Sequence, residues 1–125
     1  MDAKRIVSRA EHYRGSMVRF LRDLIAIPSE STQEKRVIQR IAAEMRSTKA
    51  FDRVWTDGFG NLFGQVGKGP RAIAIDAHVD TVGVGDRSEW KHDPYAGRVA
   101  SGRVWGRGAG DQEGHPGAED AGHQA

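Results

Sequence analysis

The chain has 125 residues, of which 38% are apolar and 29% charged, a balance typical of one soluble globular domain or of part of a larger one. The formal net charge of +2 is too small to indicate a nucleic-acid or membrane partner. The absence of cysteine excludes a disulfide framework, thiolate zinc ligands and a cysteine nucleophile. Since the sequence shows no signal peptide and no run of roughly 20 apolar residues, we expect a cytoplasmic protein.

Two amphipathic helices are predicted before residue 50. Apolar residues recur at three- and four-residue spacing over 6–25, and Pro28 ends that helix. Ser31 and Glu34, in "STQE", are spaced as a capping box for a second helix. We interpret both helices as packing elements. A basic face on the first helix is interpreted as solvated, because acidic and apolar residues interrupt it; it comprises Lys4, Arg5, Arg9, Arg14, Arg19 and Arg22.

Short strands follow the helices. "DRVWTD" (52–57) and "NLFGQV" (61–66) flank a turn, and "GRVAS" (97–101) and "RVWG" (103–106) predict a hairpin turning at Ser101–Gly102. Between these pairs, "RAIAID" (71–76) is nearly continuous in apolar residues, as expected of a strand buried on both faces. Helices followed by strands predict an α/β fold, with an incomplete sheet flanked by helices.

The chemistry is expected just after the buried strand, in "HVDT". His78 and Asp80 are two residues apart, so in an extended segment both side chains face the same side. A neutral imidazole binds a metal such as zinc, and a neighbouring carboxylate fixes the ring's tautomer by accepting its other N–H. The alternative is a plain hydrogen-bonded pair without a metal.

A second carboxylate, Asp111, ends the glycine-rich stretch "GRGAGD". Glycines allow positive φ and bring the acid close to a bulky or charged group. One alternative is a surface β-turn. A phosphate-binding loop is disfavoured, because GxGxxG is incomplete and Asp111 and Glu113 would repel phosphate.

Four stretches together resemble the dinuclear-zinc amidohydrolases and peptidases of the M20 group, which includes acetylornithine deacetylase and succinyl-diaminopimelate desuccinylase. The likeness is strongest to the branch described as selenium-metabolism-linked hydrolases. It covers about residues 3–114, and the stretches are "MVRFLRDLIAIPSES", "DGFGNLFGQVG", "IDAHVDTVGVGDRSEWKHDPYAG" and "GRGAGDQEG".

The resemblance implies the fold, site and substrate class. Residues 1–114 would form the N-terminal part of a catalytic domain with a zinc-exopeptidase-like mixed sheet. His78 would bind one zinc, Asp80 would orient His78, and Asp111 would bridge two zincs. The implied reaction is hydrolysis of an amide or peptide bond in N-acyl amino acids or small peptides. Cobalt or manganese are alternative metals, and the full-length form is expected to be a homodimer.

The end of the sequence departs from the family pattern. The family's general-base glutamate and later metal ligands have no counterpart, and after Trp105 the only apolar side chains are alanines. We therefore interpret 115–125 as a disordered, out-of-frame tail after Gly114, and we expect the isolated chain to be inactive. The rival hypothesis is a short protein in which His115 and His123 replace the missing ligands.

One loop offers another candidate substrate pocket. "GDRSEWKHDPY" (85–95) contains Trp90, His92 and Tyr95, which are the candidate lining residues of such a pocket. We favour the interpretation that this is a surface loop whose aromatic residues hold it against the rest of the domain.

Overall fold

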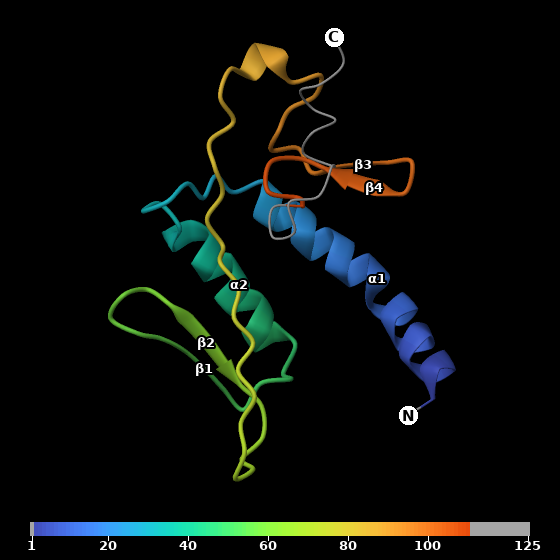
Figure 1. The fold of residues 1–125 in the computed structure, drawn as a ribbon, viewed down its shortest axis with the longest axis vertical. Helices are drawn as coiled ribbons and strands as arrows, with labels where there is room; N and C mark the ends of the chain where they lie inside the picture. Colours follow the sequence, from blue (N-terminus) through green and yellow to red (C-terminus); the bar gives the residue numbers. More distant parts are fainter. Residues whose placement is uncertain (1, 111–125) are drawn as a thin grey trace.

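The structure is a computed structural model, and it describes residues 2–110 (Figure 1). Two α-helices lead into two separate β-hairpins, with one short 3-10 helix between the hairpins. The elements are α1 (Ala3–Ile25), α2 (Lys35–Ser47), β1 (Arg53–Thr56), β2 (Leu62–Gln65), η1 (Arg87–Glu89), β3 (Arg98–Ala100) and β4 (Arg103–Trp105). This mixture of helices and strands confirms the α/β class, whereas a larger mixed sheet is not formed among residues 2–110.

Helix α1 agrees with the predicted amphipathic helix. Its first turn is capped by Asp2, whose Oδ1 accepts the Lys4 N–H at 3.0 Å. Of its residues only Ile25 is buried, at 4% exposed, while apolar residues nearer its start, such as Met17, are more than half exposed. Although α1 has 23 residues, no helix in the described part of the chain is long and apolar enough to cross a membrane.

The capping box predicted for α2 is wrong. The helix begins at Lys35, its N-cap residue is Glu34, and no side chain caps it. Thr32 lies between Ser31 and Glu34 and has a φ of 76°. Its N–H donates to Glu34 Oε1 at 2.8 Å. Ser31 instead donates its hydroxyl to the carboxylate of Asp80. Because the helix begins only at Lys35, Ser31 lies three residues before the N-cap position that a capping box requires.

The first hairpin confirms two predicted strands. β1 and β2 pair antiparallel from Arg53 opposite Gln65 to Thr56 opposite Leu62. Trp55 and Phe63 form a directly opposed pair whose rings are stacked, with centroids 5.1 Å apart. Such cross-strand aromatic pairs help to stabilise a two-stranded sheet.

The second hairpin confirms the predicted turn at Ser101–Gly102. Ala100 pairs with Arg103, so the loop has two residues, and both have positive φ, 51° for Ser101 and 75° for Gly102. These are the signs required by a type I′ turn, whose twist matches that of the flanking strands.

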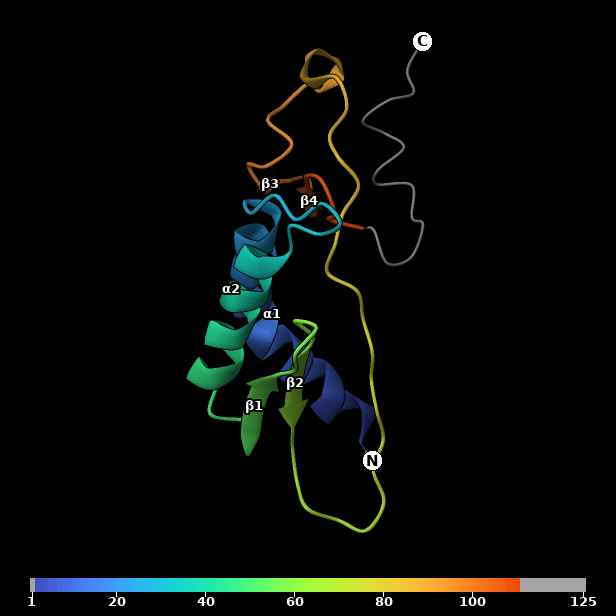
Figure 2. The ribbon, with the colours of Figure 1, turned by 90° about the vertical axis from the view of Figure 1, so that its left-hand side faces the viewer.

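The strand predicted at 71–76 is wrong. This segment is extended but has no strand partner in the described structure, and its apolar side chains are open to solvent, Ile73 at 93% and Ile75 at 95%. Figure 2 shows the segment as a single trace set apart from the helices and hairpins. A strand buried on both faces needs neighbouring strands and covering layers, and the strands among residues 2–110 pair only within their own hairpins.

Candidate functional site

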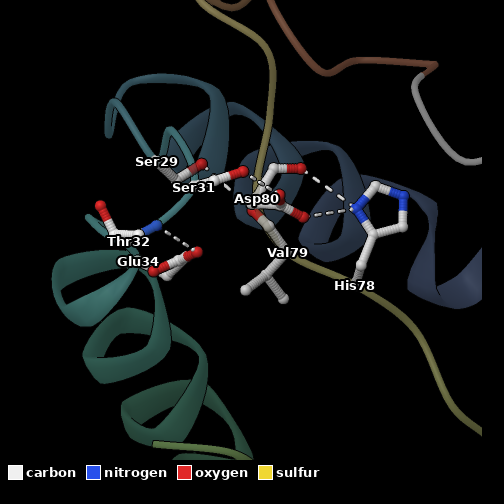
Figure 3. Close-up of polar contacts among 7 residues, drawn as sticks. All are labelled: Ser29, Ser31, Thr32, Glu34, His78, Val79 and Asp80. Atoms are coloured by element: carbon white, nitrogen blue, oxygen red, sulfur yellow. Dashed lines mark hydrogen bonds and ion pairs between the residues drawn. The ribbon is translucent and has the colours of Figure 1, made fainter.

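The candidate site forms where the loop between α1 and α2 meets the segment that contains the "HVDT" motif. Figure 3 shows the contact between residues 29–31, here called the serine loop, and residues 78–80. The Thr81 N–H donates to the Ser29 carbonyl oxygen at 2.9 Å, and the Ser29 hydroxyl donates to the Val79 carbonyl oxygen at 3.1 Å. Ser29 is itself buried, at 3% exposed. These two bonds fasten the backbone on both sides of Asp80.

His78 and Asp80 lie within hydrogen-bond distance. His78 Nδ1 is 3.0 Å from Asp80 Oδ1 and 3.1 Å from the Asp80 carbonyl oxygen (Figure 3). Both oxygens are acceptors, so Nδ1 carries the proton in this arrangement. A neutral imidazole protonated on Nδ1 has its lone pair on Nε2, the nitrogen through which such a ring binds a metal. The His78 side chain is 53% exposed and that of Asp80 38%.

Asp80 is held in its charged form. The Ser31 hydroxyl donates to Asp80 Oδ2 at 2.6 Å, while Oδ1 faces the His78 ring. The hydrogen bond from Ser31, and after it the one from His78, lower the pKa of the Asp80 carboxyl below its ordinary value, because both bonds favour the carboxylate. Asp80 is therefore suited to accept hydrogen bonds rather than protons.

This arrangement differs from that of a serine nucleophile. In a Ser–His–Asp triad the serine hydroxyl is bonded to the imidazole, which removes its proton. Here the hydroxyl of Ser31 is bonded to Asp80, and Asp80 separates it from His78. The geometry thus provides an oriented histidine, not an activated hydroxyl.

The glycine-rich loop packs beside this pair. Gly108 has a φ of 77°, and a Cβ placed on it would lie 2.6 Å from Cγ2 of Thr81, the residue after Asp80. The loop is also fixed by the Arg107 N–H, which donates to the Pro94 carbonyl oxygen at 2.8 Å. The structure therefore places the described part of the glycine-rich stretch, which ends at Gly110, next to the segment that contains "HVDT".

Two predictions lie outside the described residues. Asp111, the predicted bridging ligand, is one of them, and the tail 115–125 is the other. Within residues 2–110, no three histidine, cysteine, aspartate or glutamate side chains are grouped so that they could hold a metal ion. The described residues thus fit one ligand position of a zinc site, His78 Nε2, with Asp80 behind it.

The loop at 85–95 is packed by its own aromatic residues. The Trp90 indole N–H donates to the Val84 carbonyl oxygen at 2.8 Å, and the Arg107 guanidinium lies 4.8 Å from the centre of the Trp90 ring. The Arg87 guanidinium lies 5.8 Å from the Tyr95 ring, and His92 contacts Arg98. These contacts favour the loop-packing interpretation over a substrate pocket.

Sequence reasoning missed the part that Ser29 and Ser31 play in the site. The spacing of Ser31 and Glu34 favoured a local helix cap, and nothing in that pattern points to a residue 49 positions away. The available signal was the alternation in "SES" after Pro28, because hydroxyls two residues apart in an extended segment face the same side.

The chain is similar to several curated proteins. It is 50% identical to the Escherichia coli protein YgeY, itself described as uncharacterized, over 111 residues that are 89% of this chain and 27% of YgeY. It is 37% identical over 95 residues to a succinyl-diaminopimelate desuccinylase of Cereibacter sphaeroides and 30% identical over 99 residues to one of Beijerinckia indica. These alignments cover 73% and 74% of this chain, and 25% and 26% of the two relatives.

The chain thus spans about a quarter of the length of the curated relatives it matches. No family model matches it, and no solved structure does. The desuccinylase names support the resemblance to the M20 group at a coarse level.

Proposed function

We propose that this chain comes from a metal-dependent hydrolase lineage of the M20 type, which cleaves an amide or peptide bond in an N-acyl amino acid or small peptide. The similarity to two succinyl-diaminopimelate desuccinylases over nearly three quarters of the chain supports this lineage. The observation that carries the proposal is the hydrogen bond between His78 Nδ1 and Asp80 Oδ1, because a histidine that binds a metal through one ring nitrogen typically donates its other N–H to such a carboxylate.

Each proposed site residue has a distinct task. His78 would hold one zinc through Nε2, Asp80 would keep the ring in the required tautomer, and Asp111 would be the carboxylate shared by two zincs. Bound zinc supplies a Lewis acid and a water whose pKa is lowered to about 7. Cobalt and manganese are alternative metals at the same ligands.

We further propose that the 125 residues by themselves do not turn over substrate. A catalytic zinc keeps three protein ligands, whereas no group of three possible ligands exists among residues 2–110 and the proposed ligands are His78 and Asp111. A second candidate function follows from the same observation, namely a non-catalytic chain that binds a single metal weakly. A cytoplasmic location and a homodimer of the full-length form complete the proposal.

Calorimetric zinc titration and a hydrolysis assay on N-acetyl amino acids test these proposals. We expect at most one weakly bound zinc, no turnover, and weaker binding in His78→Ala than in the matched control His12→Ala, whose histidine lies on exposed α1. Two tightly bound zincs, with turnover that His78→Ala abolishes, would overturn the proposed inactivity. Equal zinc binding in the two variants would overturn the role of His78.

The interpretation of the tail as out of frame has its own test. Resequencing the coding DNA should reveal a shifted frame near Gly114, followed by codons for the family's general-base glutamate and later metal ligands. An intact frame without such codons would contradict it.

A further inference from the structure

We propose that Ser31 is a positioning residue for the His78–Asp80 pair, fixing the Asp80 carboxylate so that Oδ1 faces His78 Nδ1. The significance of this role for metal binding rests on the function proposed above. The geometric claim does not, since it concerns only side chains that the structure describes.

The two oxygens of Asp80 have separate partners. Oδ2 accepts the Ser31 hydroxyl at 2.6 Å, and Oδ1 lies 3.0 Å from His78 Nδ1 (Figure 3). The terminal torsion of an aspartate is broad and roughly two-fold, so a carboxylate bonded at one oxygen alone rotates readily. A second, short, charge-assisted bond at Oδ2 restricts that rotation and keeps Oδ1 directed at the ring.

Ser31 is able to restrict Asp80 because its own loop is fixed. Ser29, two residues earlier, is bonded to the backbone at Val79 and Thr81, which are the neighbours of Asp80. Ser29 is 3% exposed, and the preceding helix ends at the buried Ile25. The hydroxyl of Ser31 is therefore presented from backbone that is tied to the same segment as its acceptor.

The orientation of the Asp80 carboxylate determines which ring nitrogen of His78 carries the proton. While Oδ1 accepts the Nδ1 proton, the lone pair of neutral His78 stays on Nε2, where a metal is bound. Without the hydroxyl of Ser31, Oδ1 is held less well while the Asp80 carbonyl oxygen stays 3.1 Å from Nδ1, so part of the population shifts to the tautomer with the proton on Nε2. Loss of a residue that orients a histidine ligand lowers metal affinity by about 10-fold to 100-fold.

The experiment compares the unmodified chain with Ser31→Ala, Ser31→Thr and Ser88→Ala. Ser31→Thr keeps the hydroxyl and should rescue the effect. Ser88→Ala is the matched control, because Ser88 donates to Asp86 Oδ1 at 2.7 Å in a serine–aspartate pair away from His78. The ring-nitrogen ¹⁵N shifts of His78, measured without metal where the imidazole is neutral, report the tautomer, and calorimetry reports the zinc dissociation constant.

We expect the proton of His78 on Nδ1 in the unmodified chain, Ser31→Thr and Ser88→Ala, and a shift toward Nε2 in Ser31→Ala, with zinc binding about 10-fold weaker. An unchanged tautomer in a folded Ser31→Ala would overturn the proposal. If Ser31→Ala does not fold, the isosteric pair Ser31→Thr and Ser31→Val makes the same comparison. A proton on Nε2 in the unmodified chain would overturn the proposal without any variant.

The two proposals fail in different ways. If the unmodified chain binds no zinc but its tautomer responds to Ser31→Ala, the metal function is wrong and the positioning role stands. If zinc binds at His78 and the tautomer is insensitive to Ser31, the positioning role is wrong and the metal function stands.

Discussion

At the scale of single residues, Gly108 determines how closely the glycine-rich loop approaches the candidate site. Its φ of 77° disfavours any side chain, and a Cβ would also lie 2.6 Å from Thr81 Cγ2. Gly102 has nearly the same φ, 75°, but no atom within 4 Å of its Cβ position. Alanine substitutions at the two glycines therefore distinguish the cost of a left-handed backbone, which both share, from the cost of the steric clash, which only Gly108 has.

We predict that Gly108→Ala lowers the free energy of unfolding more than Gly102→Ala. Both variants pay a left-handed backbone cost of about 1–2 kcal/mol, and the contact with Thr81 adds about 1–3 kcal/mol at Gly108. Urea unfolding of the two variants measures the difference, and Thr81→Ser, which removes Cγ2, should recover part of it in the Gly108→Ala background. Equal losses in both variants would contradict the close packing of the loop.

The sequence predicts the residues of the pair but not the contact that holds it. His78 and Asp80 are two apart in one extended segment, so their proximity follows from local geometry. The bond from Ser31 joins residues 49 positions apart, and the local capping pattern with Glu34 pointed elsewhere. Contacts at this separation depend on how elements pack, which a local pattern does not contain.

At the scale of elements, the β1–β2 turn is built around the Asp57 carboxylate. Oδ1 accepts the N–H groups of Phe59 and Asn61, both at 2.9 Å, and Oδ2 accepts the Asn61 side-chain amide at 2.9 Å. The amide of Asn61, followed by the backbone N–H donors, lowers the pKa of Asp57 below its ordinary value of 3.8.

We predict that the turn contributes stability that acid removes. Since the pKa of Asp57 is lower in the folded state, the unfolded chain binds the proton more readily. The contribution is complete above about pH 3.8 and is lost as the pH falls through the lower folded value. An NMR titration should give Asp57 a pKa below 3.8, and Asn61→Ala should raise it toward 3.8. A pKa of Asp57 that Asn61→Ala leaves unchanged would contradict this account.

The β3–β4 turn offers a prediction of the opposite sign, a stabilising substitution. Ser101 has a φ of 51°, a region that asparagine tolerates better than serine, and Asn-Gly is the preferred pair in a type I′ turn. Ser101→Asn should raise the free energy of unfolding by up to about 1 kcal/mol. Ser101→Val, a β-branched residue, should lower it. Thermal unfolding of both variants checks the turn type, and a stabilising valine would exclude it.

Both hairpins were predictable, whereas the state of 71–76 was not. A hairpin is specified by adjacent strands and the turn between them, as Ser101–Gly102 illustrates. A strand buried on both faces is specified by distant partners, and its own residues reveal only that it is apolar. The apolar pattern in "RAIAID" predicted a buried strand, but Ile73 and Ile75 are exposed because no described strand pairs with them.

At the scale of the whole molecule, much apolar surface is exposed and little is buried. The buried apolar side chains of the described structure are few, and among them are Ile25, Val37 and Ala42. Exposed apolar side chains lie on α1, as at Met17, and along 71–76. A chain with this balance has a small hydrophobic contribution to folding and a surface favourable for association.

We predict that the 125-residue chain self-associates through residues 71–76. This segment combines exposed isoleucines with backbone groups that no strand among residues 2–110 pairs, which is the combination that promotes edge-to-edge pairing. Ile73→Lys with Ile75→Lys removes the apolar side chains, and Ala72→Pro with Ala74→Pro removes N–H donors while keeping both isoleucines. Sedimentation velocity over a concentration series measures the association.

The two double variants distinguish how copies would meet. Backbone pairing requires both the N–H groups and an apolar contact, so each double variant should return the chain toward the monomer. Association that only the lysine variant reduces would indicate apolar contact without strand pairing. Association that neither variant reduces would exclude 71–76 and leave the exposed face of α1, with Met17, as the surface to substitute next.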